Sequence, residues 1–259
     1  MVREDLAIRI KDVSKSYRLI RNRPTSVKEA IIRRSRRFSI ENFWALRDID
    51  LDIPKGSFFG LIGHNGSGKS TLLKLLSGIH RQTSGTIEID GQISALLELG
   101  AGFHPELTGR ENIYLNGAIL GINRRQMSEL VEEIVEFSGI GEFVDSPVRV
   151  YSSGMYVRLG FAIAVHVNPE ILLVDEVIAV GDEEFQRKCL HHMGILREQG
   201  VTIVLVSHDI DQVREMCDRV AWIDKSQLVE VGEPEEVCEH YLNHVNLEEE
   251  KLEPEQDSE

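Results

Sequence analysis

Residues 58–73 read FFGLIGHNGSGKSTLL. Inside this stretch stands the Walker A pattern GxxxxGKS, which runs from Gly63 to Ser70. The apolar run 58–62 before it predicts a buried strand, and the run 70–76 after it predicts a helix. Glycines let the loop turn tightly, so that successive backbone N–H groups point inward at a phosphate. A strand, a glycine-rich loop and a helix in this order predict a nucleoside triphosphate site.

Each part of the motif has a chemical role. The helix after the loop adds about half a positive charge at its N-terminus. Lys69 supplies a full charge for the β- and γ-phosphates, and the hydroxyl of Ser70 is placed to coordinate Mg²⁺. The alternative is a chance glycine-rich turn, and the strand and helix on either side argue against it. The candidate nucleotide-binding residues are Gly63, His64, Asn65, Gly66, Ser67, Gly68, Lys69, Ser70 and Thr71.

The composition excludes several classes of protein. Apolar residues make up 42% of 259 residues, so a sizeable core can form, and the net charge of −14 argues against nucleic-acid binding. The three cysteines lie far apart and have no metal or redox spacing. With no signal-like N-terminus, this predicts a cytoplasmic protein. Since no apolar run approaches the roughly 18–20 residues of a membrane span, we expect no transmembrane segment.

The charge is unevenly distributed. Residues 21–37 contain seven Lys or Arg and one Glu, whereas residues 246–259 contain seven acidic residues and one Lys. The acidic end has almost no apolar content, which predicts a disordered tail or linker after a domain over 1–245.

The basic segment lies within a predicted insert at about residues 21–40. Strands are expected over 6–13 and from Phe43 to Ile53. The connection between them is far longer than a usual hairpin loop of about 2–5 residues. A capping box at Ser26 and apolar positions on one face predict a short basic amphipathic helix. Such a helix is typical of a membrane surface or an anionic ligand site, and the alternative is a solvated basic loop.

The rest of the chain alternates between predicted strands and helices, which indicates an α/β fold with a covered parallel sheet. A hairpin is expected around Lys225 and Ser226, and a final helix over 235–245. The other predicted strands are 85–91, 171–174 and 201–206, and the run 93–99 is apolar. The other predicted helices are 106–120, 124–137, 152–167, 183–199 and 209–217.

The predicted strand 171–174 is followed by two carboxylates, Asp175 and Glu176. This is the Walker B pattern, in which Asp175 would hold Mg²⁺ and Glu176 would polarise the attacking water. Phosphoryl transfer needs mainly positioning, charge neutralisation and an oriented nucleophile. The pattern is common by itself, but together with Walker A it indicates hydrolysis of the triphosphate.

From residue 6 to about 235 the chain resembles the nucleotide-binding subunits of ABC transporters. The resemblance implies a P-loop ABC ATPase fold with a RecA-like core, an antiparallel β subdomain and a helical subdomain at about 100–165. It also implies that Tyr17 stacks on adenine, that His208 senses the γ-phosphate and that Asp182 is the D-loop aspartate. The segment 151–155, YSSGM, stands where the family has its LSGGQ signature. It departs at three of five places, but Ser152, Ser153 and Gly154 keep a helix N-terminus able to bind a phosphate.

One family motif is absent. The family places a glutamine that contacts Mg²⁺ and the membrane partner in the loop before the helical subdomain, and residues 97–105 contain none. Glu98 is the nearest polar candidate for that role, and Gln92 comes too early. We therefore expect an altered contact there, with Glu98 as the substitute.

The segments 96–117 (LLELGAGFHPELTGRENIYLNG), 151–155 (YSSGM) and 174–182 (VDEVIAVGD), together with the basic insert, resemble the subfamily that exports O-antigen and related polysaccharides, or teichoic acids. That similarity implies a homodimer with ATP and Mg²⁺ at its interface, a separate membrane permease and, indirectly, a lipid-linked polysaccharide. It places the protein at the cytoplasmic face of the inner (plasma) membrane, as a peripheral subunit. Import of a small solute is the nearer alternative. A non-transport ABC ATPase of DNA repair or translation is the other, although the chain has neither a long coiled-coil insertion nor a second cassette.

Overall fold

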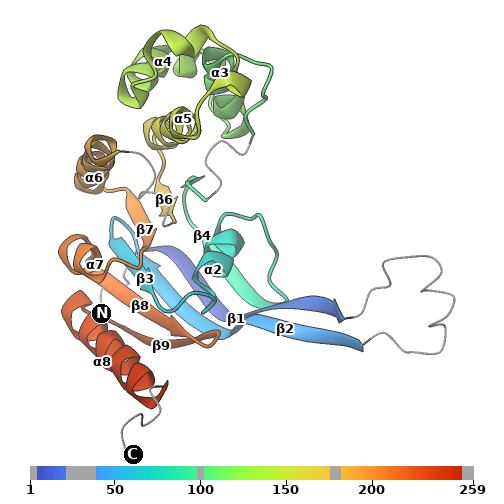
Figure 1. The fold of residues 1–259 in the computed structure, drawn as a ribbon, viewed down its shortest axis with the longest axis vertical. Helices are drawn as coiled ribbons and strands as arrows, with labels where there is room; N and C mark the ends of the chain where they lie inside the picture. Colours follow the sequence, from blue (N-terminus) through green and yellow to red (C-terminus); the bar gives the residue numbers. More distant parts are fainter. Residues whose placement is uncertain (1–4, 22–38, 98–101, 176–181, 253–259) are drawn as a thin grey trace, which may run out of the picture.

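The computed structural model describes residues 5–21, 39–97, 102–175 and 182–252. These residues form two sheets flanked by helices, with a helical subdomain at one end of the molecule (Figure 1). The predicted division into an α/β core, an antiparallel β subdomain and a helical subdomain is confirmed.

The larger sheet has the strand order β5-β6-β7-β3-β8-β9 within the described residues. The first five of these strands are parallel, and β9 forms an antiparallel hairpin with β8. Every residue of the central strands β3, β6 and β7 is buried, as expected for a sheet covered on both faces. The strands are β3 (Phe58–Ile62), β5 (Ile93–Ala95), β6 (Ile171–Val174), β7 (Thr202–Val206), β8 (Arg219–Asp224) and β9 (Gln227–Gly232).

Side chains of β3 alternate between two separate cores. Phe58 and Ile62 join a core with the helices on one face, whereas Phe59 and Leu61 join a core on the other. The first face is covered by α6 (Glu183–Glu198), α7 (Ile210–Met216) and α8 (Pro234–Leu252), and the second by α2 (Lys69–Leu76) and the smaller sheet.

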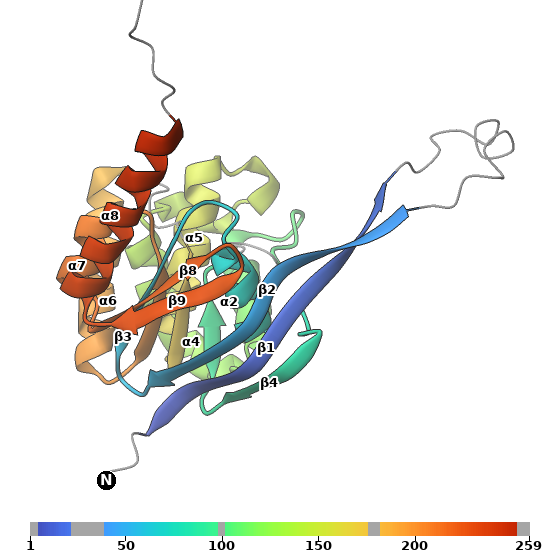
Figure 2. The same cartoon turned by 90° about the horizontal axis from the view of Figure 1, so that it is seen from below.

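The smaller sheet is antiparallel, in the order β2-β1-β4. Its strands are β1 (Leu6–Arg21), β2 (Ser39–Pro54) and β4 (Ser84–Ile89). The first two are longer than predicted and project beyond the sheet as a two-stranded ribbon (Figure 2). Their pairing continues to Arg21 opposite Ser39. The expected basic helix within 22–38 lies outside the described residues.

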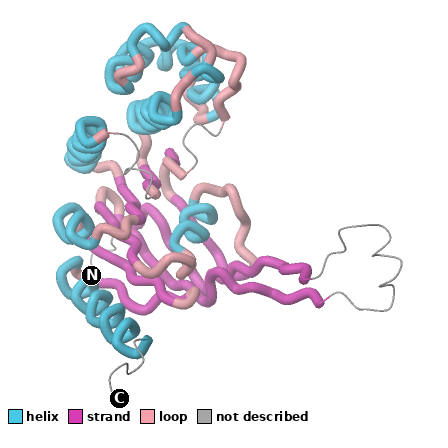
Figure 3. The backbone as a smooth tube through the Cα atoms, viewed as in Figure 1, coloured by secondary structure: helices cyan, strands magenta, loops and turns pink. Residues whose placement is uncertain are grey.

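The helical subdomain consists of α3 (Gly109–Ile119), α4 (Arg124–Ser138) and α5 (Ser153–His166), with 3₁₀ turns η1 (Gly141–Asp145) and η2 (Val148–Val150). Figure 3 shows these helices gathered away from the strands. Capping boxes mark the N-termini of two of these helices. Thr108 and Glu111 form the capping box of α3, and Asn123 and Gln126 form that of α4. The helix expected from residue 106 therefore begins three residues later.

The last helix is longer than expected. It begins at Pro234, with acidic side chains in its first turn, and continues to Leu252. Residues 246–252 were predicted to be the start of a disordered tail because they are polar, but Leu, Glu and Lys are strong helix formers. Residues 253–259 lie outside the described part. No helix in the described ranges is both long and apolar enough to cross a membrane.

Candidate nucleotide-binding site

The Walker A loop connects β3 to α2 with a backbone that only glycine adopts readily. Gly63, Gly66 and Gly68 have φ of 144°, 81° and 121°. Two of them also lie against other backbone. A Cβ on Gly63 would stand 2.0 Å from the carbonyl oxygen of Ile223, and one on Gly68 would stand 2.6 Å from that of Ala45. The turn that the sequence predicts is thus fixed by conformation and by close packing.

Lys69 is buried inside this loop, with 5% of its surface exposed. Its ammonium donates to the carbonyl oxygens of Gly63, at 2.6 Å, and His64, at 3.0 Å. The His64 oxygen also accepts from the backbone N–H of Ser67, at 3.1 Å. The ammonium is therefore held at the centre of the loop, where it can turn to a phosphate.

The N-terminus of α2 is suited to an anion. Its cap residue, Gly68, makes no side-chain hydrogen bond, and the first turn contains no acidic residue. The N–H groups of that turn and the helix dipole are therefore left for a negatively charged ligand. The hydroxyl of Ser67 is buried and has no hydrogen-bond partner among the described residues.

The parallel sheet brings the other predicted groups to the edge where the Walker A loop lies. Leu61 is paired with Val206, and Val174 with Leu205, so β3, β7 and β6 end at nearly the same level. Asp175 directly follows β6, and Ser207 and His208 directly follow β7. With strands spaced by about 4.8 Å, Asp175 is about 10 Å from the Walker A strand across the sheet. A triphosphate with its metal ion spans such a gap.

The segment after β7 is braced by its own hydrogen bonds. The hydroxyl of Ser207 donates to the side chain of Gln212 and accepts from the N–H of Asp209, at 3.1 and 3.0 Å. Asp209 caps α7 by accepting from the N–H of Gln212 at 3.0 Å. This fixes the backbone on either side of His208, which is exposed.

Tyr17 lies on β1, opposite Phe43 of β2. Its ring packs edge-on to His80, with centroids 5.8 Å apart, and the ammonium of Lys15 lies 4.9 Å from its centre. The neighbouring strand is tied to the Walker A loop through the β8–β9 turn. Ser226 donates from its hydroxyl to the Trp44 carbonyl at 2.9 Å, and its N–H donates to the Ser67 carbonyl at 3.1 Å.

The signature-like segment lies in the helical subdomain, apart from α2 (Figure 1). Ser152 caps α5, and its hydroxyl accepts from the N–H of Met155 at 3.2 Å. Ser152 and Ser153 are exposed and Gly154 is half-buried, so this helix N-terminus faces outward. Within one chain, the Walker A loop and this N-terminus belong to different subdomains.

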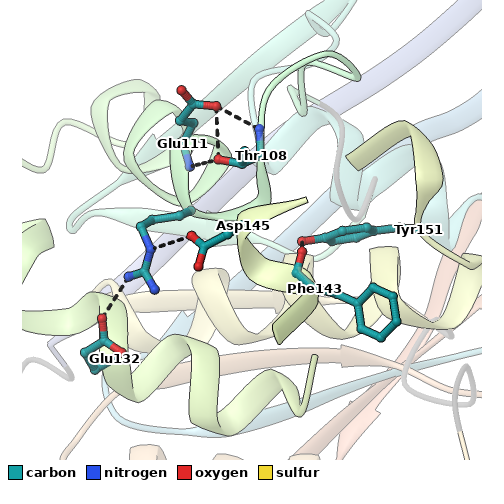
Figure 4. Close-up of polar contacts among 7 residues, drawn as sticks. Thr108, Glu111, Glu132, Phe143, Asp145 and Tyr151 are labelled. Carbon is teal, nitrogen blue, oxygen red and sulfur yellow. Dashed lines mark hydrogen bonds and ion pairs between the residues drawn. The ribbon is translucent and has the colours of Figure 1, made fainter. Parts of the chain in front are cut away.

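Tyr151, just before that N-terminus, is anchored in a way that the sequence pattern does not indicate. Its hydroxyl donates to the carbonyl of Phe143 at 2.7 Å (Figure 4). A Cβ on Gly109 would be 2.1 Å from that hydroxyl. Burial, together with the nearby carboxylate of Asp145, raises the pKa of Tyr151. Arg110 bridges Asp145 and Glu132 at 3.1 and 2.8 Å.

Asp182 caps α6, where its carboxylate accepts from the N–H of Phe185 at 2.9 Å. Its other oxygen accepts from the guanidinium of Arg158 on α5. Arg158 also lies over the ring of Phe185, 5.1 Å from its centre. Sequence reasoning missed Arg158, since only its position in the turn after the signature-like segment sets it apart.

Two predicted residues, Glu98 and Glu176, lie outside the described residues. Gln92 is at the opposite, amino end of β5, where its N–H donates to Glu170 at 2.6 Å and its side-chain amide to the Leu120 carbonyl at 2.7 Å. That position agrees with its exclusion from the nucleotide site.

The predicted metal ligands fit Mg²⁺. Ser70 is exposed at the start of α2 and Asp175 is half-buried after β6. Both offer hard oxygen donors, and Mg²⁺ typically takes only one or two protein oxygens besides phosphates and water. The described residues contain no cluster of three or more His, Cys, Asp or Glu side chains placed to hold a metal by themselves.

Comparison with known proteins gives an independent result. The sequence profile of the ABC transporter family matches residues 46–179, slightly more than half of the chain. The chain is 52% identical, over 93% of its length, to the O-antigen export system ATP-binding protein RfbB of Myxococcus xanthus. It is 42% identical, over 98% of its length, to the teichoic acids export ATP-binding protein TagH of Enterococcus faecalis. The chain spans 56% of the length of each of these relatives.

A solved structure shares the fold. A dimeric ATP-binding cassette in a post-hydrolysis state, bound to ADP and Pi, superposes with a TM-score of 0.70 and 22% identity. The superposition covers 88% of this chain and 98% of that one.

Proposed function

Because the chain belongs to the ABC transporter family, we propose that it is the ATP-hydrolysing subunit that powers export of a lipid-linked cell-surface polysaccharide, of O-antigen type, through a separate membrane permease. The observation that carries the ATPase part is the Walker A loop, with its buried lysine bonded to Gly63 and His64 and its uncapped helix N-terminus. The relatives named for O-antigen and teichoic acid export support the polysaccharide part.

The site is completed by a second copy of the chain. The Walker A loop and the Ser152–Gly154 helix N-terminus belong to different subdomains, and the latter faces outward. Two copies in a head-to-tail arrangement bring the helix N-terminus of one to the triphosphate bound by the other, where it donates N–H groups to the γ-phosphate. The dimeric state of the solved cassette with the same fold agrees with this arrangement.

Residues at the sheet edge divide the chemistry of hydrolysis between them. Lys69 neutralises the β- and γ-phosphates, and Ser70 with Asp175 would hold Mg²⁺, which would neutralise charge on the phosphate oxygens. Glu176 orients the attacking water, and His208 contacts the γ-phosphate from its braced segment after β7. Closure of the dimer on ATP, and its opening after hydrolysis, then drives the permease through the segment 98–105.

The relatives and the charge support the proposed substrate and location. A subunit of an O-antigen exporter works at the cytoplasmic face of the inner membrane, where its substrate is attached to a lipid carrier through a pyrophosphate. The net charge of +6 over residues 21–37 suits contact with anionic headgroups or a pyrophosphate at that face. Because the Enterococcus relative is named for teichoic acid export, teichoic acid is the second candidate substrate.

The test uses two substitutions with opposite expected defects. Glu176→Gln should bind ATP, lose turnover and accumulate as a nucleotide-bound dimer in size-exclusion chromatography, because only the water-orienting carboxylate is removed. Lys69→Ala should lose binding of labelled ATP. Unchanged ATPase activity in Glu176→Gln would contradict the assignment.

The substrate is tested by export in cells. Deletion of the chain's gene should leave lipid-linked polysaccharide on the inner side of the membrane, and the sugar composition of that material distinguishes O-antigen from teichoic acid. Charge reversal at Arg33, Arg34, Arg36 and Arg37 should impair export and leave ATPase activity unchanged. Normal export in that variant would exclude a membrane role for the basic segment.

A further inference from the structure

The C-terminal helix reaches the Walker A loop. The ring of Tyr241 on α8 packs edge-on against the ring of His64, with centroids 5.7 Å apart. His64 is the second residue of the Walker A pattern, and its carbonyl accepts from the Lys69 ammonium at 3.0 Å. A single residue of the loop is thus bonded on its backbone to the phosphate-binding lysine and packed on its side chain against α8.

Tyr241 is itself fixed by the strand next to the loop. Its ring packs against that of Trp222 on β8, at 5.8 Å and 70°, and Trp222 is paired with Ile62, the residue before the loop. Trp222 also packs against His244, one helical turn further along α8, at 5.1 Å. The ring of Tyr241 is half-buried against the core, and this burial, with Asp224 as the second cause, raises the pKa of Tyr241.

Separate contacts hold α8 on the body of the protein. Val237 and Cys238 are fully buried on its inner side. His240 contacts the Glu230 carboxylate of β9 at 2.9 Å, and Arg214 of α7 lies 3.6 Å from Glu235. The helix is therefore docked independently of the Tyr241 contact (Figure 2). Removal of that contact should leave α8 in place.

From these contacts we infer that Tyr241 is a positioning residue for the Walker A loop and that it transmits the nucleotide state of the loop to α8. The inference rests on ATP binding at the proposed site. When a triphosphate takes the Lys69 ammonium, the His64 carbonyl loses a donor, and the loop around His64 adjusts. The ring of His64 moves with it against Tyr241, and the Tyr241–Trp222 pair follows. The helix that continues to Leu252 then reports whether the loop is occupied.

Trp222 provides a direct readout. The chain has two tryptophans, Trp44 and Trp222. In a Trp44→Phe background, Trp222 is the sole tryptophan, and titration with ATP should shift its emission. The binding of labelled ATP is measured separately in the same Trp44→Phe background, with Lys69→Ala as the non-binding control. Absence of ATP binding in the Trp44→Phe chain would contradict the proposed function itself, whereas the variants below test Tyr241 alone.

Tyr241→Leu keeps apolar volume under α8 and removes the ring that contacts His64. It should lose the ATP-dependent shift of Trp222 and raise the KM for ATP about two- to tenfold, the range expected for one aromatic pair. The value of kcat should stay within about twofold, since no transition-state contact is removed. Tyr241→Phe keeps the ring and should restore both properties. Leu242→Ala, at the next position and 36% exposed, is the matched control and should behave as the parent.

The result that would overturn the inference is equally specific. A Tyr241→Leu chain with the parent's KM for ATP and the parent's Trp222 response would show that the loop does not depend on α8. The inference would also be overturned if His240→Ala, which releases the Glu230 contact but not the His64 contact, abolished the Trp222 response to the same extent, because the response would then depend on the docking of α8 as a whole and not on Tyr241.

Discussion

The guanidinium of Arg158 on α5 donates to the carboxylate of Asp182, the residue that caps α6. This contact joins the helix that begins at the signature-like segment to the residue predicted to be the D-loop aspartate. The Arg158 side chain is 26% exposed and that of Asp182 is 59% exposed. An exposed pair of this kind adds at most about 1 kcal/mol to stability, so its importance is expected to lie in coupling rather than in folding.

Substitution of Asp182 separates these two roles. Asp182→Asn should keep the helix cap, because Asn and Asp cap about equally well, but it removes the charge that Arg158 binds. We expect little change in thermal unfolding and a fall of about fivefold in kcat, which corresponds to about 1 kcal/mol. Asp182→Ala, which also loses the cap, should cost about 1 kcal/mol of stability in addition. Parental kcat in Asp182→Asn would argue that the ion pair has no part in turnover.

Gly109 and Tyr151 form a pair whose substitutions should not be additive. A Cβ on Gly109 would stand 2.1 Å from the Tyr151 hydroxyl, so Gly109→Ala must displace the hydroxyl from the Phe143 carbonyl. Alone, Gly109→Ala should destabilise the chain by about 1–3 kcal/mol and Tyr151→Phe by about 1 kcal/mol. In the double variant the contact with the hydroxyl is removed, and the closest remaining contacts of the Gly109 Cβ are the Val144 carbonyl oxygen at 3.0 Å and Cζ of residue 151 at 3.2 Å.

We therefore expect the double variant to be more stable than Gly109→Ala alone. Urea denaturation of the four chains completes the cycle. A double variant whose loss equals the sum of the two single losses would contradict the contact as described.

The glycines of the Walker A loop differ in what they tolerate. Gly63→Ala would place a Cβ 2.0 Å from the Ile223 carbonyl, whereas a Cβ on Gly66 meets nothing within 4 Å. Gly66→Ala should therefore cost only the strain of its positive φ, about 1–2 kcal/mol. Gly63→Ala should cost more than about 3 kcal/mol and abolish ATP binding, because the β8 backbone has to move. Equal midpoints of thermal unfolding for the two variants would disprove this ranking.

Much of the fold was predictable because its signals are local. The fully buried strands β3 and β6 occupy the predicted residues, since short apolar runs bounded by turn residues specify buried parallel strands. The start of α4 at Arg124 was also predicted, and its capping box is written in adjacent residues. The end of α8 was missed, because a polar composition rich in Leu, Glu and Lys suits both a solvated tail and a helix.

The candidate site also has a part that the sequence predicts and a part that it does not. Walker A is a continuous motif, and its loop could be located from sequence with its flanking strand and helix. The contact between His64 and Tyr241 and that between Arg158 and Asp182 join different elements, so no spacing or periodicity indicates them. They arise when α8 and α5 pack, and only the three-dimensional arrangement makes them visible. The roles of all the predicted site residues stay predictions, and Glu98 and Glu176 also lie outside the described residues.

Two histidines at the base of the helical subdomain predict a loss of stability in acid. His166 on α5 and His192 on α6 stack with ring centroids 4.9 Å apart, and both pack edge-on against Phe137. Lys188 lies 4.5 Å from the centre of the Phe137 ring, and Glu133 and His191 also act on the pair. Burial lowers the pKa of both histidines, and for His192 the neighbouring His166 lowers it further.

The sign of the effect follows from linkage. Because the folded pKa of each histidine lies below the unfolded value of about 6.5, the unfolded chain binds protons first as the pH falls. The stability that the neutral pair contributes is therefore complete above about pH 6.5 and is lost as the pH falls from there through the folded pKa. Each histidine can contribute a slope of up to about 1.4 kcal/mol per pH unit.

His192→Phe removes one titrating group and keeps a ring against Phe137, so the unfolding free energy should fall less between about pH 7.5 and about pH 5.5 than in the parent. His240→Gln is the opposite control. A hydrogen bond to Glu230 raises the pKa of His240, so its contribution is present below the unfolded pKa and is lost as the pH rises through the folded value. His240→Gln should accordingly steepen the loss in acid. Urea denaturation across the pH range measures the unfolding free energy of each chain. Parallel curves of unfolding free energy against pH for the parent and His192→Phe would show that the stacked pair does not titrate as described.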